Sequence, residues 1–201
     1  MMRGCENVIP PQRVLHTFNT FDENSNASWV SMFGDLAKCQ KERGLIPEFS
    51  FLGPDHGATS TDSNLPIKHF NASQKRSDAF SIPFLKYLWE QKDIRINHIH
   101  SLDRMSRAIQ LASQLKRIPC IVTVSHESQL NSESQNSNDF NPANAFGIHS
   151  LWNKIFERTC NPISTLNSAD WINCLGENSM NGVKKCIDHD RIDYIPYGIE
   201  Y

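Results

Sequence analysis

The sequence predicts an α/β domain with a mainly parallel sheet and helices on both faces. Short apolar runs alternate with longer stretches in which apolar residues recur at helical spacing, along most of the 201 residues. Two of the apolar runs, residues 120–124 and 169–175, fit strands that are buried on both faces. Because strands that alternate with helices are joined by right-handed crossovers, the sheet is expected to be mainly parallel.

The amino-terminal part begins with an expected strand over residues 13–18. A helix is expected over residues 27–43, where apolar residues recur three and four positions apart, and Gly44 suits its end. A second strand is expected over residues 48–52, followed by a glycine and a proline. Residues 54–79 are rich in Ser, Thr, Asp and Asn, and we expect them to form a surface excursion.

The alternation continues to the end of the chain. Helices are expected over residues 82–91, 104–116, 148–167 and 179–187, with Pro162 breaking the third of these. Strands are expected over residues 94–100, 120–124, 169–175 and 191–195, and residues 127–145 are expected to be a loop. Phe84, Leu88 and Trp89 share a helix face that fits the core, with a membrane or a second subunit as the alternative.

Composition excludes several classes of function. The formal net charge is −2 and no long basic run exists, so nucleic acid is not an expected partner. The loop over residues 19–28 lacks the glycine pattern of a dinucleotide site. Six cysteines form no metal-type spacing and are expected to be small buried hydrophobes in a reducing compartment rather than a disulfide framework. No secretion signal or membrane span is recognisable, and the expected location is cytoplasmic.

Several polar residues follow the expected strands, where open parallel sheets bind ligands. His98 and His100 share one face of a strand, but the sequence offers no convincing third metal ligand, so packing is the favoured role of His98. His100 ends its strand and is either a crevice residue or structural. His126 directly follows a buried strand and could bond a sugar hydroxyl or steady a leaving phosphate, the alternative being a loop histidine. The polar loop over residues 19–28 is either a ligand loop or solvated.

Four segments, in order, resemble the amino-terminal domain of family 4 glycosyltransferases. Residues 168–177 (SADWINCLGE) resemble that family's strand followed by Ser-Glu, and residues 191–200 (RIDYIPYGIE) resemble its IPNG segment. Residues 94–101 (IRINHIHS) and 118–126 (IPCIVTVSH) are similar to its two histidine-bearing strands. The chain departs from the pattern in its first loop, which lacks the family's glycine pair, and at Tyr197, which replaces asparagine.

The resemblance implies a GT-B arrangement, in which two Rossmann-like domains face a cleft. Residues 1–201 are then expected to be one acceptor-side domain, without the donor-binding domain. The implied activity moves a sugar from a nucleotide-sugar donor to a hydroxyl acceptor in cell-surface polysaccharide biosynthesis, with the nucleotide sugar as co-substrate and no cofactor. The implied partners are a glycan or lipid-linked acceptor, the missing donor domain and the inner face of the membrane, as a peripheral contact.

The resemblance also assigns roles to individual residues. His126 matches the family's active-site histidine and is the expected catalytic residue. The expected substrate-binding residues lie at the ends of the strands, and no metal ligand is expected; they are Asn19, Asn24, His100, Ser101, Glu177 and Gly198. A second hypothesis is a non-catalytic module that binds a glycan or lipid-linked acceptor, or that docks with a separate donor-domain chain.

Overall fold

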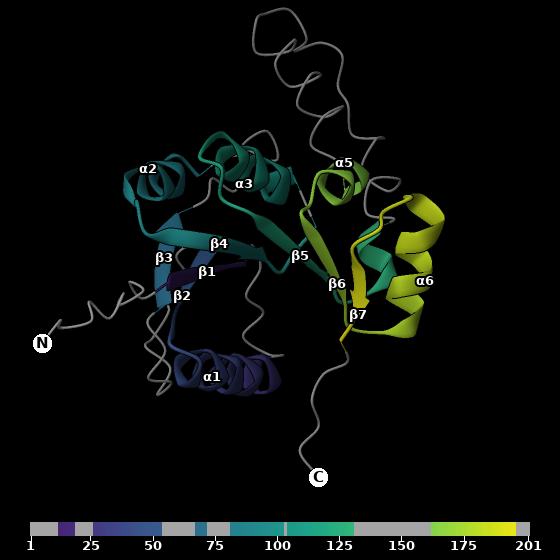
Figure 1. Ribbon diagram of the computed structural model, residues 1–201, viewed down its shortest axis with the longest axis horizontal. Helices are drawn as coiled ribbons and strands as arrows, with labels where there is room; N and C mark the ends of the chain where they lie inside the picture. Colours follow the sequence, from purple (N-terminus) through teal and green to yellow (C-terminus); the bar gives the residue numbers. More distant parts are fainter. Residues whose placement is uncertain are drawn as a thin grey trace, which may run out of the picture.

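The sheet has seven strands and every pairing in it is parallel. The computed structural model describes residues 12–18, 26–53, 67–71, 81–102, 104–130 and 162–195. The strand order is β3-β2-β1-β4-β5-β6-β7 (Figure 1). The strands are β1 (Gln12–Phe18), β2 (Leu45–Gly53), β3 (Ile67–Asn71), β4 (Ile94–Ile99), β5 (Cys120–Val124), β6 (Trp171–Cys174) and β7 (Ile192–Tyr194). The predicted fold class, a parallel α/β sheet, is confirmed.

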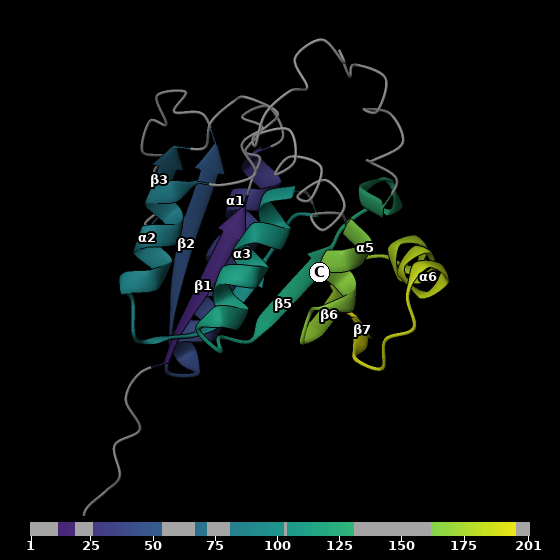
Figure 2. The ribbon, with the colours of Figure 1, turned by 90° about the horizontal axis from the view of Figure 1, so that it is seen from above.

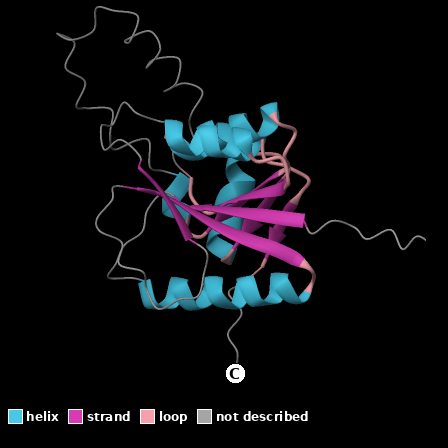
Figure 3. Ribbon diagram, turned by 90° about the vertical axis from the view of Figure 1, so that its left-hand side faces the viewer, coloured by secondary structure: helices cyan, strands magenta, loops and turns pink. Residues whose placement is uncertain are grey.

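Helices cover both faces of the sheet, as the sequence predicts (Figure 3). They are α1 (Asn26–Glu42), α2 (Ile82–Glu90), α3 (Arg104–Leu115), η2 (Glu127–Leu130), α5 (Pro162–Asn167) and α6 (Glu177–Cys186). Helix α1 lies on one face, whereas α2, α3 and α5 lie on the other (Figure 1). Figure 2 shows α2 and α3 side by side along that second face, and α6 lies beside β7 at the end of the sheet. No helix in the described part of the chain is long and apolar enough to span a bilayer.

Two apolar clusters hold the helices to the sheet. The larger cluster lies under α2, α3 and α5 and contains Leu15, Phe84 and Leu88, each at most 1% exposed. Burial of one such side chain contributes about 1.5–3 kcal/mol. The smaller cluster joins α1 to β2. The core prediction is therefore confirmed for Phe84 and Leu88, whereas Trp89 on the same helix is 62% exposed.

The structure differs from the sequence-based prediction in two segments. Residues 67–71, expected to belong to a surface excursion, form β3, and Glu127–Leu130, expected to be loop, form a 3-10 turn. Strand β3 pairs with β2 through its backbone and lies at the edge of the sheet. At the edge of a sheet a strand can carry charged residues, and Lys68 remains 46% exposed there while its Nζ lies 3.1 Å from Glu48. Residues 148–161, part of an expected helix, lie outside the described residues.

The described cysteines are free thiols. Cys120 and Cys174 are fully buried, as expected of small hydrophobes, whereas Cys39 and Cys186 are exposed. Burial raises the pKa of Cys120 to about 12 and that of Cys174 to about 11. A thiol with so high a pKa carries almost no thiolate at neutral pH, so these two cysteines are expected to be chemically inert.

Lys116 closes the carboxyl end of α2 and gives a first testable prediction. Its Nζ donates to the carbonyl oxygens of Leu88 (2.7 Å) and Trp89 (2.8 Å), and also to that of Gln91. Because these carbonyls lack partners within the helix, Lys116→Met is expected to lower the free energy of unfolding by about 1–2 kcal/mol.

Urea denaturation of the wild type and the variant measures this loss. The matched control is Lys86→Met on the same helix, because the Lys86 side chain is 75% exposed and, within the described part of the chain, its ion pair is with Glu90 at 3.8 Å. That control is expected to change the free energy of unfolding by less than about 0.5 kcal/mol. Equal effects of the two substitutions would show that Lys116 does not stabilise the end of α2.

Candidate functional site

The strand order reverses between β1 and β4. From β1 the chain turns toward β2 on one side, and from β4 it proceeds to β5 on the other side. In open parallel sheets, ligands bind beyond the carboxyl ends of the strands at such a reversal. The topology therefore places the candidate site at the ends of β1 and β4.

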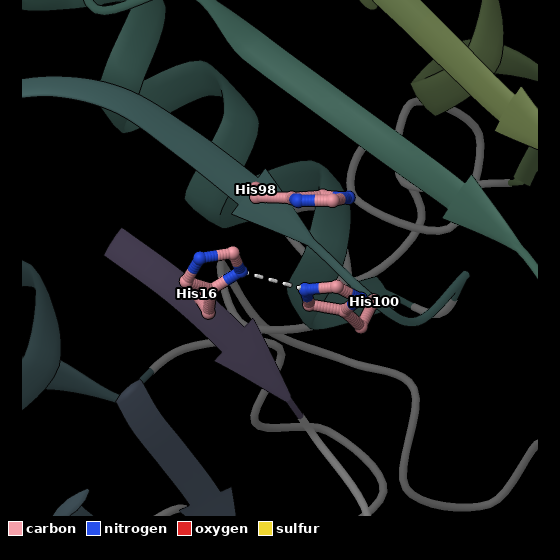
Figure 4. A group of neighbouring side chains, drawn as sticks. All are labelled: His16, His98 and His100. Carbon is pink, nitrogen blue, oxygen red and sulfur yellow. Dashed lines mark hydrogen bonds between the residues drawn. The ribbon is translucent and has the colours of Figure 1, made fainter. Parts of the chain in front are cut away.

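Three histidines meet at this reversal, and we call them the histidine triad: His16, His98 and His100 (Figure 4). His16 on β1 is the direct register partner of His98 on β4, and His100 comes just after β4 on the same face. His16 Nδ1 lies 3.0 Å from His100 Nε2, and one ring nitrogen of each histidine lies within 4.8 Å of the others. His98 Nε2 lies 2.6 Å from Thr123 Oγ1 on β5.

Helix α1 and the aromatic residues of the smaller cluster enclose the triad. The His16 ring is fully buried, lies 3.0 Å through Nε2 from Gln40 Oε1, and stacks on Phe49 at 4.9 Å between ring centroids. His100 stacks on Phe18 at 4.7 Å, with the ring planes only 8° apart. His98 and His100 are partly exposed. The triad is therefore enclosed on the α1 side and less completely covered beside His98 and His100.

Burial keeps the three imidazoles neutral. It lowers the pKa of His16 to about 4, although the hydrogen bond with Gln40 acts in the opposite direction. Burial, and to a smaller extent the neighbouring histidines, hold the pKa of His98 and His100 well below 6.5. At neutral pH each ring therefore has one N–H group and one nitrogen lone pair. The triad can accept hydrogen bonds, donate them or bind a metal ion.

Among the other predicted site residues, Ser101, His126 and Glu177 lie at the same edge of the sheet. Ser101 follows His100 after β4, is partly buried and lies near the hydroxyl of Ser106, with 3.3 Å between the two oxygens. His126 is exposed beyond β5, and Glu177 is exposed at the first residue of α6, beyond β6. Asn19, Asn24 and Gly198 lie outside the described residues.

A short turn fixes the backbone that carries His126. The side-chain oxygen of Gln129 accepts the backbone N–H groups of Ser125 at 3.0 Å and His126 at 3.4 Å. The carbonyl of His126 accepts the N–H of Gln129 at 3.1 Å. These bonds anchor the main chain while the imidazole stays exposed, so the position of His126 is fixed without burying its ring.

His16 is the site residue that sequence reasoning missed. The sequence places His98 and His100 two positions apart on one strand, but His16 lies 84 positions from His100 and belongs to another strand. The structure thus adds to the pair a third histidine that the sequence analysis did not identify. One signal could have pointed to His16. In the expected parallel sheet the order of the strands reverses beside the first strand, and His16 is the one histidine of that strand, residues 13–18.

Comparisons with known proteins show which solved structures share this fold. No family model matches the sequence, and no curated protein matches it. Solved structures that resemble the chain include a UDP-N-acetylglucosamine 2-epimerase (TM-score 0.56, 11% identity, 90% of this chain and 47% of that one). The Neisseria meningitidis UDP-GlcNAc 2-epimerase bound to UDP-GlcNAc is similar (TM-score 0.54, 14% identity, 90% of this chain and 46% of that one).

A transferase has the same fold. An alpha-glucosyltransferase in complex with UDP and a 13-mer DNA matches with TM-score 0.51 and 10% identity, over 94% of this chain and 43% of that one. The chain thus spans less than half the length of each of these three structures. At such low identity the likeness establishes a GT-B-like, Rossmann-like fold and no more.

Proposed function

We propose that this chain is the acceptor-side domain of a family 4 glycosyltransferase, which moves a sugar from a nucleotide-sugar donor to a hydroxyl acceptor. One observation carries the proposal. The carboxyl ends of β4, β5 and β6 bring His100, Ser101, His126 and Glu177 to one edge of the sheet. Imidazole, hydroxyl and carboxylate groups together bond sugar hydroxyls, and this edge is where such sheets bind ligands.

His126 is the proposed catalytic residue. The residue is exposed at the end of a buried strand and its backbone is held by Gln129, so substrate can reach an imidazole that an anchored main chain carries. An imidazole there can bond a sugar hydroxyl or stabilise the charge that develops on a departing diphosphate. His100, Ser101 and Glu177 are proposed to bind the acceptor.

The structural neighbours support a nucleotide sugar as the donor. The N. meningitidis epimerase is bound to UDP-GlcNAc, and the alpha-glucosyltransferase is in complex with UDP. We propose that the donor is held by a second domain across the cleft, in a part of the protein beyond this chain. The proposed acceptor is a glycan or lipid-linked glycan, with the protein in the cytoplasm and touching the membrane only peripherally.

Turnover by the natural full-length protein tests the proposal. The protein is incubated with a set of UDP- and GDP-sugars, with and without lipid-linked and soluble glycan acceptors, and the released nucleotide and the sugar product are quantified. Acceptor-dependent release of the nucleotide, with the sugar on the acceptor, is the expected result. If the product is an epimerised nucleotide sugar instead, the protein is an epimerase, as two of the structural neighbours are, and the proposed transfer is wrong. No turnover, but saturable binding of an acceptor by the folded protein, would favour the non-catalytic module.

A further inference from the structure

We propose that His16, His98 and His100 bind a divalent transition-metal ion of the zinc class at the junction of β1 and β4. This inference goes beyond the proposed function, because sugar transfer by the expected mechanism needs no metal. It assigns His100 to the ion, in which case Ser101 and Glu177 remain as the proposed acceptor-binding residues. It rests on four features of the triad: the spacing of the nitrogens, the partner of His16, the chemistry of the donor set and the access to solvent.

The spacing of the nitrogens is close to what an ion requires. Zinc binds imidazole nitrogen at about 2.1 Å, which sets two ligand nitrogens of a tetrahedral site roughly 3.4 Å apart. His16 Nδ1 and His100 Nε2 are already 3.0 Å apart, and the nitrogen of His98 lies within 4.8 Å of both. The His98 ring would have to turn toward the other two, and if Nε2 is the ligand atom it would exchange its 2.6 Å contact with Thr123 Oγ1 for the ion.

Gln40 prepares His16 for a ligand role. A carbonyl-type oxygen that accepts the N–H of one ring nitrogen leaves the lone pair on the other, which is a common support for metal-binding histidines. Gln40 Oε1 lies 3.0 Å from His16 Nε2, so Nε2 carries the proton and Nδ1 carries the lone pair. That same Nδ1 accepts a hydrogen bond from His100 Nε2, so an ion would take the place of this proton and neutral His100 would carry its proton on Nδ1 instead.

The donor set favours one class of ion. The triad offers three neutral imidazoles, and among the described residues no carboxylate bonds to any of the three rings. Neutral imidazole suits zinc, nickel, copper and iron, whereas magnesium and calcium require several oxygen ligands. A site of this composition therefore selects a first-row transition ion over the alkaline-earth ions.

The access to solvent defines the fourth coordination position. His16 is fully buried, whereas His98 and His100 keep part of their residue surface exposed, so we place the open coordination position on their side. A zinc ion with three protein ligands keeps its fourth position for water or substrate. The ion would thus face solvent at the carboxyl edge, where Ser101 follows His100.

Calorimetric titration of the metal-free protein with Zn²⁺ tests the proposal. Cys39→Ser and Cys186→Ser are introduced first, because these exposed thiols can bind zinc themselves. We expect one ion per chain, with no heat from Mg²⁺. His100→Phe is expected to weaken zinc binding at least about 100-fold, since it removes a ligand but retains an aromatic ring on Phe18.

Two controls separate a metal site from ordinary packing. His189→Ala removes a histidine at the opposite edge, where its Nε2 lies 3.1 Å from the carbonyl oxygen of Ala169, and leaves zinc affinity unchanged. Gln40→Leu retains all three ligands and weakens binding about tenfold by releasing His16. If the triad is only a packed cluster, the folded protein binds no zinc, or His100→Phe leaves its affinity unchanged; either result overturns the proposal.

A cobalt spectrum keeps the test decisive even if His100→Phe fails to fold. Wild-type protein loaded with one equivalent of Co²⁺ is expected to show the strong visible absorption of a four-coordinate nitrogen site. A thiolate-to-cobalt charge-transfer band would instead assign the ion to cysteine and would contradict the proposal. The weak absorption of a six-coordinate, water-rich ion would contradict it as well.

Discussion

Glu48→Gln lowers the free energy of unfolding by about 3 kcal/mol at pH 7, because it breaks a buried ion pair. Glu48 on β2 is 7% exposed. Its carboxylate pairs with the guanidinium of Arg13 on β1, accepts the hydroxyl of Tyr87 on α2, and lies 3.1 Å from Lys68 Nζ on β3. The substitution removes an anion that three strands and a helix share, and it leaves the Arg13 guanidinium, which is 14% exposed, with the exposed carboxylate of Asp93 as a remaining partner.

The loss depends on pH, and its direction follows from the pKa of Glu48. Burial alone raises that pKa, but the hydrogen bonds from Tyr87, Arg13 and Lys68 outweigh it, so the pKa lies below 4.5. A carboxyl group whose pKa is lowered by folding stabilises the protein above its unfolded pKa, and this stability is lost as the pH falls through the folded pKa. The wild type therefore loses the stabilisation by ionised Glu48 in acid, whereas the glutamine variant lacks this stabilisation at every pH.

Denaturant titrations at pH 7 and near pH 3 measure both effects. The difference between wild type and Glu48→Gln is expected to be smaller at the lower pH, because protonation of Glu48 makes it resemble glutamine. Asp93→Asn is the matched control, because Asp93 also binds Arg13, at 2.6 Å, but its side chain is 57% exposed. Its cost is expected to stay below about 1 kcal/mol. A Glu48→Gln deficit that persists unchanged in acid would contradict the assigned ion pair.

His126→Ala in the natural full-length protein lowers kcat/KM for sugar transfer by at least about 50-fold. The ring is exposed beyond β5, so its removal opens no cavity in the core. The expected loss comes from the transition state, because charge that develops on the departing diphosphate loses a hydrogen-bond donor. Steady-state kinetics with the donor and acceptor identified by the turnover assay measure it.

Two variants give this prediction its controls. Gln129→Ala retains the imidazole but removes the oxygen that accepts the N–H groups of Ser125 and His126, so a smaller loss is expected from misplacement. His189→Ala removes an imidazole at the opposite edge and leaves the rate unchanged. If His126→Ala folds normally and transfers sugar at the wild-type rate, His126 has no catalytic role.

The fold was predictable because its signals are local. The strand Cys120–Val124 and the helices around Phe84 and Ala108 show their period within a short window, and burial of their apolar residues agrees with it. Strand β3 was not predictable in this way. Ile67–Asn71 gains its structure from pairing with β2, which no local pattern records.

The candidate site was predictable only in part. His100, Ser101, His126 and Glu177 were found by a rule that needs only the ends of strands, and the structure places all four there. The same rule could not find the histidine triad, because His16 meets the other two histidines only through the pairing of β1 with β4. Contacts between distant strands are set by topology, and the sequence alone does not state which strand is the neighbour of which.

Amide hydrogen exchange tests most directly whether the carboxyl edge of the sheet is the functional face. The natural full-length protein is compared with and without the nucleotide sugar and acceptor that support turnover. Added protection is expected in residues 100–102, 125–130 and 175–179, which follow β4, β5 and β6. Residues 91–93, 117–119 and 188–191, at the opposite edge, are expected to exchange as before. Protection confined to the opposite edge, or to neither edge while ligand is bound, would contradict the account.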